Sequence, residues 1–241
     1  MKIAFCFSGQ PRDVKSTIES IKESWSKNHK VDFFYHSWWG DNNIPFRNDA
    51  PSDTYSESIF QYIDRILNPV YSLIENPIFF EKRYNDSIHW PCYHPVFNLT
   101  PDKNIQSMFY SMKKCNELKK NYEEQNNFLY DAVVKCRFDY VFSKEYNLRD
   151  FDLNYLHTKN DCKHTHYAIN DHIAVSNSKN MDIYCSLFDN LEEHYNDGVE
   201  FNPEVILGYH IEVNGLQVNK TLGDGVESYV STQKERGKSY S

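Results

Sequence analysis

The first forty residues constrain the fold more tightly than any other part of the sequence. The apolar run at residues 2–7 is typical of a buried strand, and the loop "SGQPR" follows it. Residues 13–28 then repeat apolar side chains at helical spacing, and residues 31–39 are again strand-like. A strand–loop–helix–strand order indicates a βαβ unit, whose two strands are parallel. The sequence therefore predicts an α/β fold with a central, mostly parallel sheet flanked by helices.

The rest of the chain continues this alternation. We expect helices at 56–68 and 100–125, and further helices that begin near Ser178 and at Asn202. We expect strands at the positions 76–84, 130–136, 173–175 and 216–218. No repeat or linker interrupts the pattern, which predicts one domain over residues 1–241 with a flexible tail from about residue 231.

Composition limits the binding partners and the cellular location that we expect for the protein. The net charge of −8 repels nucleic acid and anionic lipid, so we expect neither as a partner. The apolar run at the N-terminus is too short for a signal peptide, and no run approaches a membrane span, which predicts a cytoplasmic protein without a membrane span. The six cysteines lack paired spacing, so we interpret them as reduced thiols that mostly fill the core.

Two motifs follow predicted strands. In parallel α/β sheets, ligands bind beyond the carboxyl ends of the strands. In "SGQPR", backbone N–H groups of Ser8 and Gly9 and the guanidinium of Arg12 suit a phosphate or a nucleotide base, although an ordinary strand-to-helix turn explains the motif taken alone. It is not a P-loop, because "GxxxxGK[ST]" is absent, and a single glycine does not make a dinucleotide fingerprint.

The second motif is "RFD", Arg137-Phe138-Asp139, at the tip of the apolar run "YDAVVKC". Side chains at i and i+2 of a strand point to the same side, so Arg137 and Asp139 lie together. The Asp139 carboxylate suits a divalent metal that bridges phosphates, and Arg137 can neutralise phosphate charge without metal. The alternative is a purely structural role, in which Arg137 and Asp139 form an ion pair that closes the strand end. We favour the functional interpretation because the preceding run is so apolar.

Six blocks of the sequence resemble, in order, a family of GT-A-type glycosyltransferases found in bacterial surface-polysaccharide clusters and in large viruses and phages. The blocks are "KIAFCFSGQPR", "VDFFYHSWW", "QSMFYSMKKCNELKK", "YDAVVKCRFDYVF", "INDHIAVSNSKNMDIY" and "NPEVILGYHI", and they cover nearly the whole chain. The resemblance implies a nucleotide-binding sandwich that takes a nucleotide-sugar donor and transfers the sugar to a hydroxyl of a glycan acceptor. It assigns the donor nucleotide to Phe7, Ser8, Gly9, Gln10, Arg12, Arg137 and Asp139.

Such enzymes hold Mn²⁺ or Mg²⁺ with an Asp-x-Asp motif at a strand end. Asp139 matches the second carboxylate and is the implied metal ligand, whereas Arg137 replaces the first, which puts metal dependence in doubt. A literal Asp-x-Asp at residues 150–152 follows a less regular segment, and we rank it lower. The resemblance also marks Asp171 as the base that takes the proton of the acceptor hydroxyl, with Glu204 as the competing base. Each residue also has a purely structural explanation. Asp171 could belong to a turn before a strand, and Glu204 could stabilise the first turn of a helix through its negative charge.

Other residue clusters are weaker. The segment 157–172 contains the zinc-type side chains His157, Cys162, His164, His166 and His172, but their spacing matches no common zinc pattern, and His164 and His166 could equally line an acceptor groove. Trp38 and Trp39 are commoner as core than as stacking platforms, and His210 as a packed residue than as a metal ligand. No "GxSxG" elbow indicates a hydrolase. The alternatives are a sulfotransferase, another phosphate-handling transferase such as a nucleotidyltransferase, or a non-catalytic nucleotide- or sugar-binding module.

Overall fold

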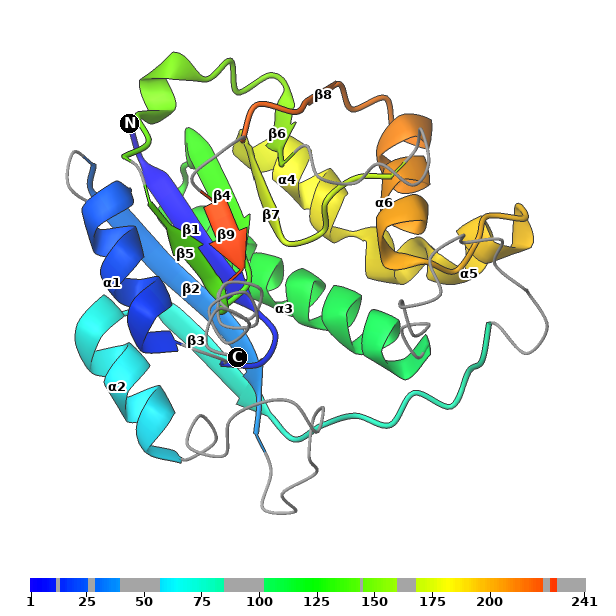
Figure 1. Cartoon of the computed structure of the whole chain (residues 1–241), viewed down its shortest axis with the longest axis horizontal. Helices are drawn as coiled ribbons and strands as arrows, with labels where there is room; N and C mark the ends of the chain where they lie inside the picture. The colour runs from blue at the N-terminus through cyan, green and yellow to red at the C-terminus, as the bar shows by residue number, and fades with distance from the viewer. Residues whose placement is uncertain are drawn as a thin grey trace, which may run out of the picture.

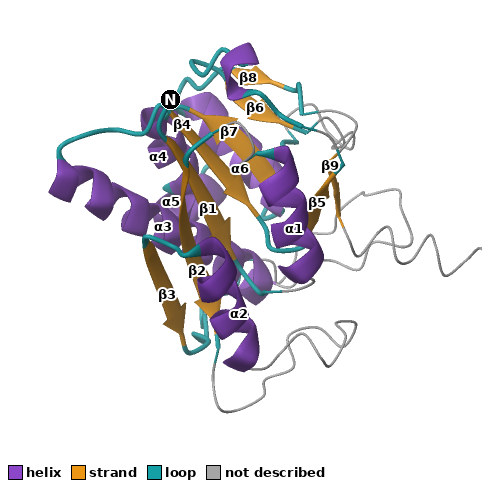
Figure 2. Ribbon diagram, turned by 90° about the vertical axis from the view of Figure 1, so that its left-hand side faces the viewer, coloured by secondary structure: helices purple, strands orange, loops and turns teal. Residues whose placement is uncertain are grey.

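The computed structural model describes residues 1–11, 14–25, 29–39, 57–84, 102–143, 145–159, 168–222 and 226–228. Its centre is a seven-stranded sheet in the order β3-β2-β1-β4-β7-β6-β8 (Figures 1 and 2). These strands are β3 Tyr71–Glu75, β2 Val31–Trp38, β1 Ile3–Ser8, β4 Ala132–Cys136, β7 Ile173–Ser176, β6 Leu156–Thr158 and β8 Val218–Asn219. A separate antiparallel pair joins β5 Tyr140–Phe142 to β9 Val226–Ser228.

The sheet is mixed but mostly parallel. Strands β3, β2, β1 and β4 run parallel to one another, and β6 is parallel to β8. Strand β7 is antiparallel to both β4 and β6. The predicted α/β class with a central, mostly parallel sheet is therefore confirmed.

Helices cover both faces of the sheet, as Figure 1 shows. Helices α1 (Val14–Ser24) and α2 (Glu57–Leu67) pack on one face, where the apolar stripe of α1 is buried against β1 and β4. Helices α3 (Asp102–Asn126), α4 (Ser178–Cys185), α5 (Leu187–Asn196) and α6 (Pro203–Val213) pack on the other. The predicted helical stripes are confirmed, because Ile18, Ile21, Phe109 and Met112 are all buried.

Two predicted strands are displaced. Residues 76–84 lie in a loop, and the third strand is β3 instead, five residues earlier. The last strand of the main sheet begins at Val218, where the prediction placed its end. The segment 146–156 contains a short 3-10 helix at Leu148–Asp150 and leads into β6.

Two other predictions are tested in part. Within the described ranges, the cysteines are free and buried: Cys6, Cys115, Cys136 and Cys185. None of the described helices is long and apolar enough to cross a membrane. The tail from residue 231 lies outside the described residues.

Candidate functional site

The site is built where the direction of winding changes. The chain runs outward from β1 to β2 and β3, and then returns to add β4 on the other side of β1. In open α/β sheets this switch point forms a crevice beyond the carboxyl ends of the two strands. Phe7 of β1 is in register with Cys136 of β4, so the two predicted motifs leave the sheet side by side. Ser8, Gly9 and Arg137 therefore lie at the same edge of the sheet.

The antiparallel strand β7 adds a third segment to this edge. Cys136, the last residue of β4, pairs with Ile173, the first residue of β7. The backbone N–H of Arg137 donates to the carbonyl of His172 at 3.1 Å. Asp171, distant in sequence, therefore lies at the same edge as Arg137 and Asp139.

Arg137 and Asp139 form a forked ion pair. Arg137 Nε donates to Asp139 Oδ1 at 2.8 Å, and one terminal nitrogen donates to Oδ2 at 2.5 Å. Phe138 points the other way and stacks on Phe7 at 4.9 Å in the core. The side chain of Asp139 is 2% exposed and that of Arg137 is 21% exposed. Burial opposes the charge on Arg137, but Asp139 and then Asp171 outweigh it and raise the Arg137 pKa.

Asp171 places a carboxylate beside this pair. Its side chain is 5% exposed, and Oδ1 lies 3.2 Å from His172 Nε2 without accepting a hydrogen bond from any described residue. Such a buried, unbonded carboxylate oxygen is costly and needs an explanation. The turn itself is firmly held: Lys135 Nζ donates to the Asp171 carbonyl, and Asn170 Oδ1 accepts from the N–H groups of His172 and Ile173. Asp171 is thus held in place with an oxygen left for another partner.

His172 links Asp171 to Tyr140. Tyr140 Oη lies 2.7 Å from His172 Nδ1. Burial, with the positive charge of Arg137, lowers the pKa of His172 to about 4. The ring is therefore neutral at pH 7. If Tyr140 donates to Nδ1, the ring proton sits on Nε2, which lies 3.2 Å from Asp171 Oδ1 but outside hydrogen-bond geometry.

The turn after β1 is held by a buried polar chain. Gly9 adopts a φ of +105°, and its N–H donates to Ser111 Oγ at 2.8 Å and to the His36 carbonyl at 3.2 Å. Ser111 Oγ lies 2.7 Å from His36 Nδ1, and His36 Nε2 lies 2.8 Å from Glu75. The expectation that the Gly9 N–H faces a phosphate is therefore wrong, because that group is already bonded.

The remaining residues assigned to the donor are spread between core and edge. Phe7 is fully buried among aromatic rings, so its side chain is part of the core. Ser8 is buried at the end of β1, and Gln10 is half-buried in the following turn. Arg12 lies outside the described residues.

Glu204 approaches the same edge through its backbone. Asn202 caps α6 by accepting from the N–H groups of Glu204 and Val205, as the Asn-Pro-Glu sequence predicts. The carbonyl of Glu204 accepts from the N–H of Ile169 at 3.1 Å, two residues before Asp171. Both candidate bases thus belong to neighbouring segments.

The weaker candidates do not join the site. Asp150 and Asp152 are exposed, and Asp152 accepts hydrogen bonds from Asn154 within a turn. Both nitrogens of His157 are engaged, by Thr221 and by the Asp152 carbonyl.

The other predicted zinc-type and aromatic residues lie either in the core or outside the described residues. Of the predicted zinc set, Cys162, His164 and His166 lie outside the described residues. His210 Nδ1 lies within hydrogen-bond distance of His194 Nε2, at 2.9 Å, and Trp38 is buried.

The donor set does not fit a divalent cation held by Asp139. Both oxygens of that carboxylate accept from Arg137. A doubly charged ion bound to this carboxylate would lie next to the guanidinium, and the two positive charges would repel each other. Among the described residues, no group of three His, Cys, Asp or Glu side chains is arranged to hold a metal ion.

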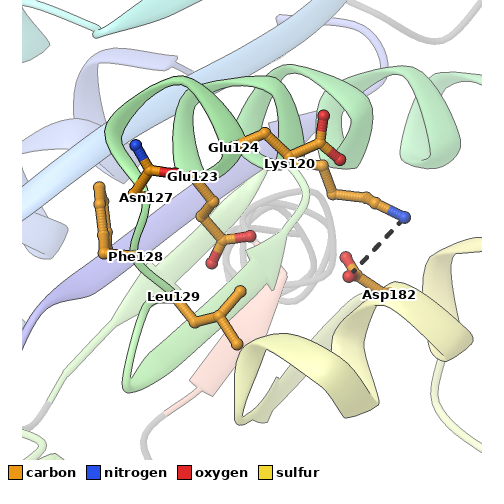
Figure 3. Close-up of a pocket in the computed structure, with 7 residues that line it drawn as sticks. All are labelled: Lys120, Glu123, Glu124, Asn127, Phe128, Leu129 and Asp182. Carbon is orange, nitrogen blue, oxygen red and sulfur yellow. Dashed lines mark ion pairs between the residues drawn. The ribbon is translucent and has the colours of Figure 1, made fainter.

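A depression of about 540 Å³ lies at the opposite end of the sheet (Figure 3). It is lined by Lys120, Glu123, Glu124, Asn127, Phe128, Leu129 and Asp182. Its acidic residue Glu123 already pairs with the fully buried Lys119 at 3.0 Å and accepts from the N–H of Tyr130. These bonds join α3 to the segment that leads into β4, so Glu123 has a structural role.

Sequence reasoning missed several polar residues beneath the site. Lys135 interrupts the apolar run of β4, and His36 interrupts that of β2. A charged or ionisable residue inside a buried strand is a usable signal, because it must find a partner. Ser111 gives no such signal, since a serine on a long helix is unremarkable.

Comparison with known proteins identifies no family for this chain, so the functional argument rests on the geometry of the site. No protein-family model matches the sequence, and no curated protein matches it.

Proposed function

We propose that this chain is a glycosyltransferase of the GT-A type that moves a sugar from a nucleoside diphosphate sugar to a hydroxyl group of a glycan. One observation carries the proposal: at the switch point, an accessible arginine anchored by Asp139 lies beside Asp171, whose buried Oδ1 has no hydrogen-bond partner among the described residues. A cation that faces a diphosphate and a carboxylate that accepts a proton are the two groups this transfer needs.

The reaction follows from these roles. The acceptor oxygen forms a bond to the anomeric carbon while the bond from that carbon to the diphosphate oxygen breaks. The electron pair of the broken bond leaves with the diphosphate, where Arg137 offsets the growing negative charge. The acceptor proton passes to Asp171, and Glu204 stands as the alternative base. Divalent metal would supply further charge neutralisation if bound, but the Asp139 donor set does not fit it.

The structure also bears on the other candidate functions. A sulfotransferase or a nucleotidyltransferase would use the same cationic edge for a different donor. A non-catalytic nucleotide- or sugar-binding module would use it without turnover. Asp171 favours the transferase, because a binding module has no need to bury a carboxylate oxygen without a partner.

A thermal-shift panel separates these possibilities. The ligands are UDP-, GDP-, CMP- and dTDP-sugars, together with the sulfonucleotide donor of sulfotransferases. A ligand at a hundred times its Kd stabilises the protein by roughly 2.7 kcal/mol, which is a rise in Tm of about 5–11 °C for a chain of this size. We expect one nucleoside diphosphate sugar to give that rise. A rise with the sulfonucleotide alone would replace the proposal.

A further inference from the structure

We propose that Arg137 takes the place of the divalent cation, so that the site binds the diphosphate of its donor without metal. The inference rests on the proposed function and deepens it, because it specifies how the diphosphate is held. It comes from the disagreement between the donor set at Asp139 and the metal that an Asp-x-Asp enzyme would use.

The first support is the geometry of the guanidinium. Nε and one terminal nitrogen of Arg137 donate hydrogen bonds to the Asp139 carboxylate, at 2.8 and 2.5 Å. These bonds use two of the five N–H donors of an arginine. Among the described residues no hydrogen bond occupies the other three donors, which belong to a planar group of fixed orientation, and arginine forks of this kind match phosphate oxygens.

The second support is the order of the two side chains from the inside out. The Asp139 side chain is 2% exposed, whereas that of Arg137 is 21% exposed. The carboxylate therefore lies behind and the cation faces the surface at the switch point. A metal site needs the reverse order, with carboxylate oxygens directed outward to the ion.

The third support is the charge around the pair. Arg137 stays protonated, because Asp139 and Asp171 outweigh the effect of burial and raise its pKa. His172 is neutral, and Lys135 donates to the Asp171 carbonyl on the interior side of β4. Within the part of the chain that the structure describes, Arg137 is thus the positive group presented at this point of the edge, and its charge does not depend on an ion from solution.

The experiment measures the Kd of UDP, GDP, CDP and dTDP by isothermal titration calorimetry. Each titration is run with EDTA and again with Mn²⁺. We expect one nucleoside diphosphate to bind with the same Kd in both buffers. The Arg137→Gln variant should weaken that binding by about tenfold to a hundredfold, which is the effect of losing a charged hydrogen bond.

Two further variants keep the result interpretable. Arg149→Gln removes an exposed arginine from the 3-10 helix and should bind as the wild type does. The single variant leaves the buried Asp139 carboxylate without its counter-charge, which destabilises the fold. The double variant Arg137→Gln with Asp139→Asn removes both charges, so it tests the loss of binding without that destabilisation. Its circular dichroism spectrum and thermal transition report whether it folds.

The outcomes are distinct. Binding that appears only with Mn²⁺ would overturn the inference and leave the proposed function in place. Wild-type affinity in the folded double variant would also overturn it, because the pair would then only close the strand end. No binding of any nucleoside diphosphate in either buffer would overturn the proposed function as well.

Discussion

Replacement of Asp139 by asparagine tests whether the anchored arginine exists in solution. The change removes one of the two oxygens that hold Arg137 and leaves the guanidinium without its counter-charge. Breaking a buried pair costs about 3–5 kcal/mol. Because the Arg137 side chain is 21% exposed, water offsets part of that cost, and we expect a loss of about 2–3 kcal/mol. This corresponds to a fall in Tm of about 4–12 °C.

The assay is thermal unfolding followed by circular dichroism, with urea titration as a second probe. Asp150→Asn is the matched control, because Asp150 is exposed and its loss should change stability by no more than about 0.5 kcal/mol. The double variant Arg137→Gln with Asp139→Asn should recover part of the loss, with a coupling of about 0.5–3 kcal/mol. An Asp139→Asn variant that melts with the wild type would refute the reasoning that the carboxylate anchors the guanidinium.

Three further predictions follow from the site. Asp171→Asn should lower kcat for sugar transfer by about 10²–10⁴-fold while the thermal transition persists; activity near that of the wild type would move the role of base to Glu204. Gly9→Ala should lower the free energy of unfolding by about 1–3 kcal/mol in urea titration, because its φ of +105° is strained for any Cβ although the space around it is open; an unchanged midpoint would contradict this. Stability should fall as pH drops from about 6.5 to about 4, by roughly 3 kcal/mol at most, because the unfolded chain protonates His172 first; His172→Gln should flatten this fall, and a profile equal to that of the wild type would exclude His172 as its source.

Much of the fold follows from local patterns. The opening βαβ unit is visible because buried parallel strands need continuous apolar runs, and their crossover helix needs an apolar stripe. The start of α6 is visible because Asn202 and Pro203 satisfy the requirements of a helix N-terminus. These signals reside in residues that are neighbours in sequence.

The displaced third strand shows where local patterns fail. Strand β3 lies at the edge of the sheet, and its burial pattern is mostly exposed, so its residues need not be apolar. It is held by main-chain pairing with β2, from Phe34 opposite Tyr71 onward. The more apolar residues at 76–84 drew the prediction away, yet Ile78 and Phe79 are exposed. Backbone pairing carries little signature in side-chain composition.

The sequence offers candidate residues for the site but does not specify their geometry. Strand periodicity predicts that Arg137 and Asp139 lie together, and they do form a contact, although they lie in the turn between β4 and β5 and not in a strand. The approach of Asp171 depends on β7 running antiparallel to β4, which no local pattern specifies. The bonded state of the Gly9 N–H depends on Ser111, which lies on α3 about a hundred residues away. Such long-range pairings are set by the tertiary fold.

Turnover of a nucleotide sugar is the most direct test of the central claim. The measurement is release of nucleoside diphosphate, together with transfer of the sugar to an added glycan, from the donor that raises the Tm of the wild-type protein. The account predicts turnover by the wild type and by Arg149→Gln, and its loss in Asp171→Asn and Arg137→Gln. Binding of the donor without turnover by the wild type, across a panel of glycan acceptors, would contradict the transferase and leave a binding module.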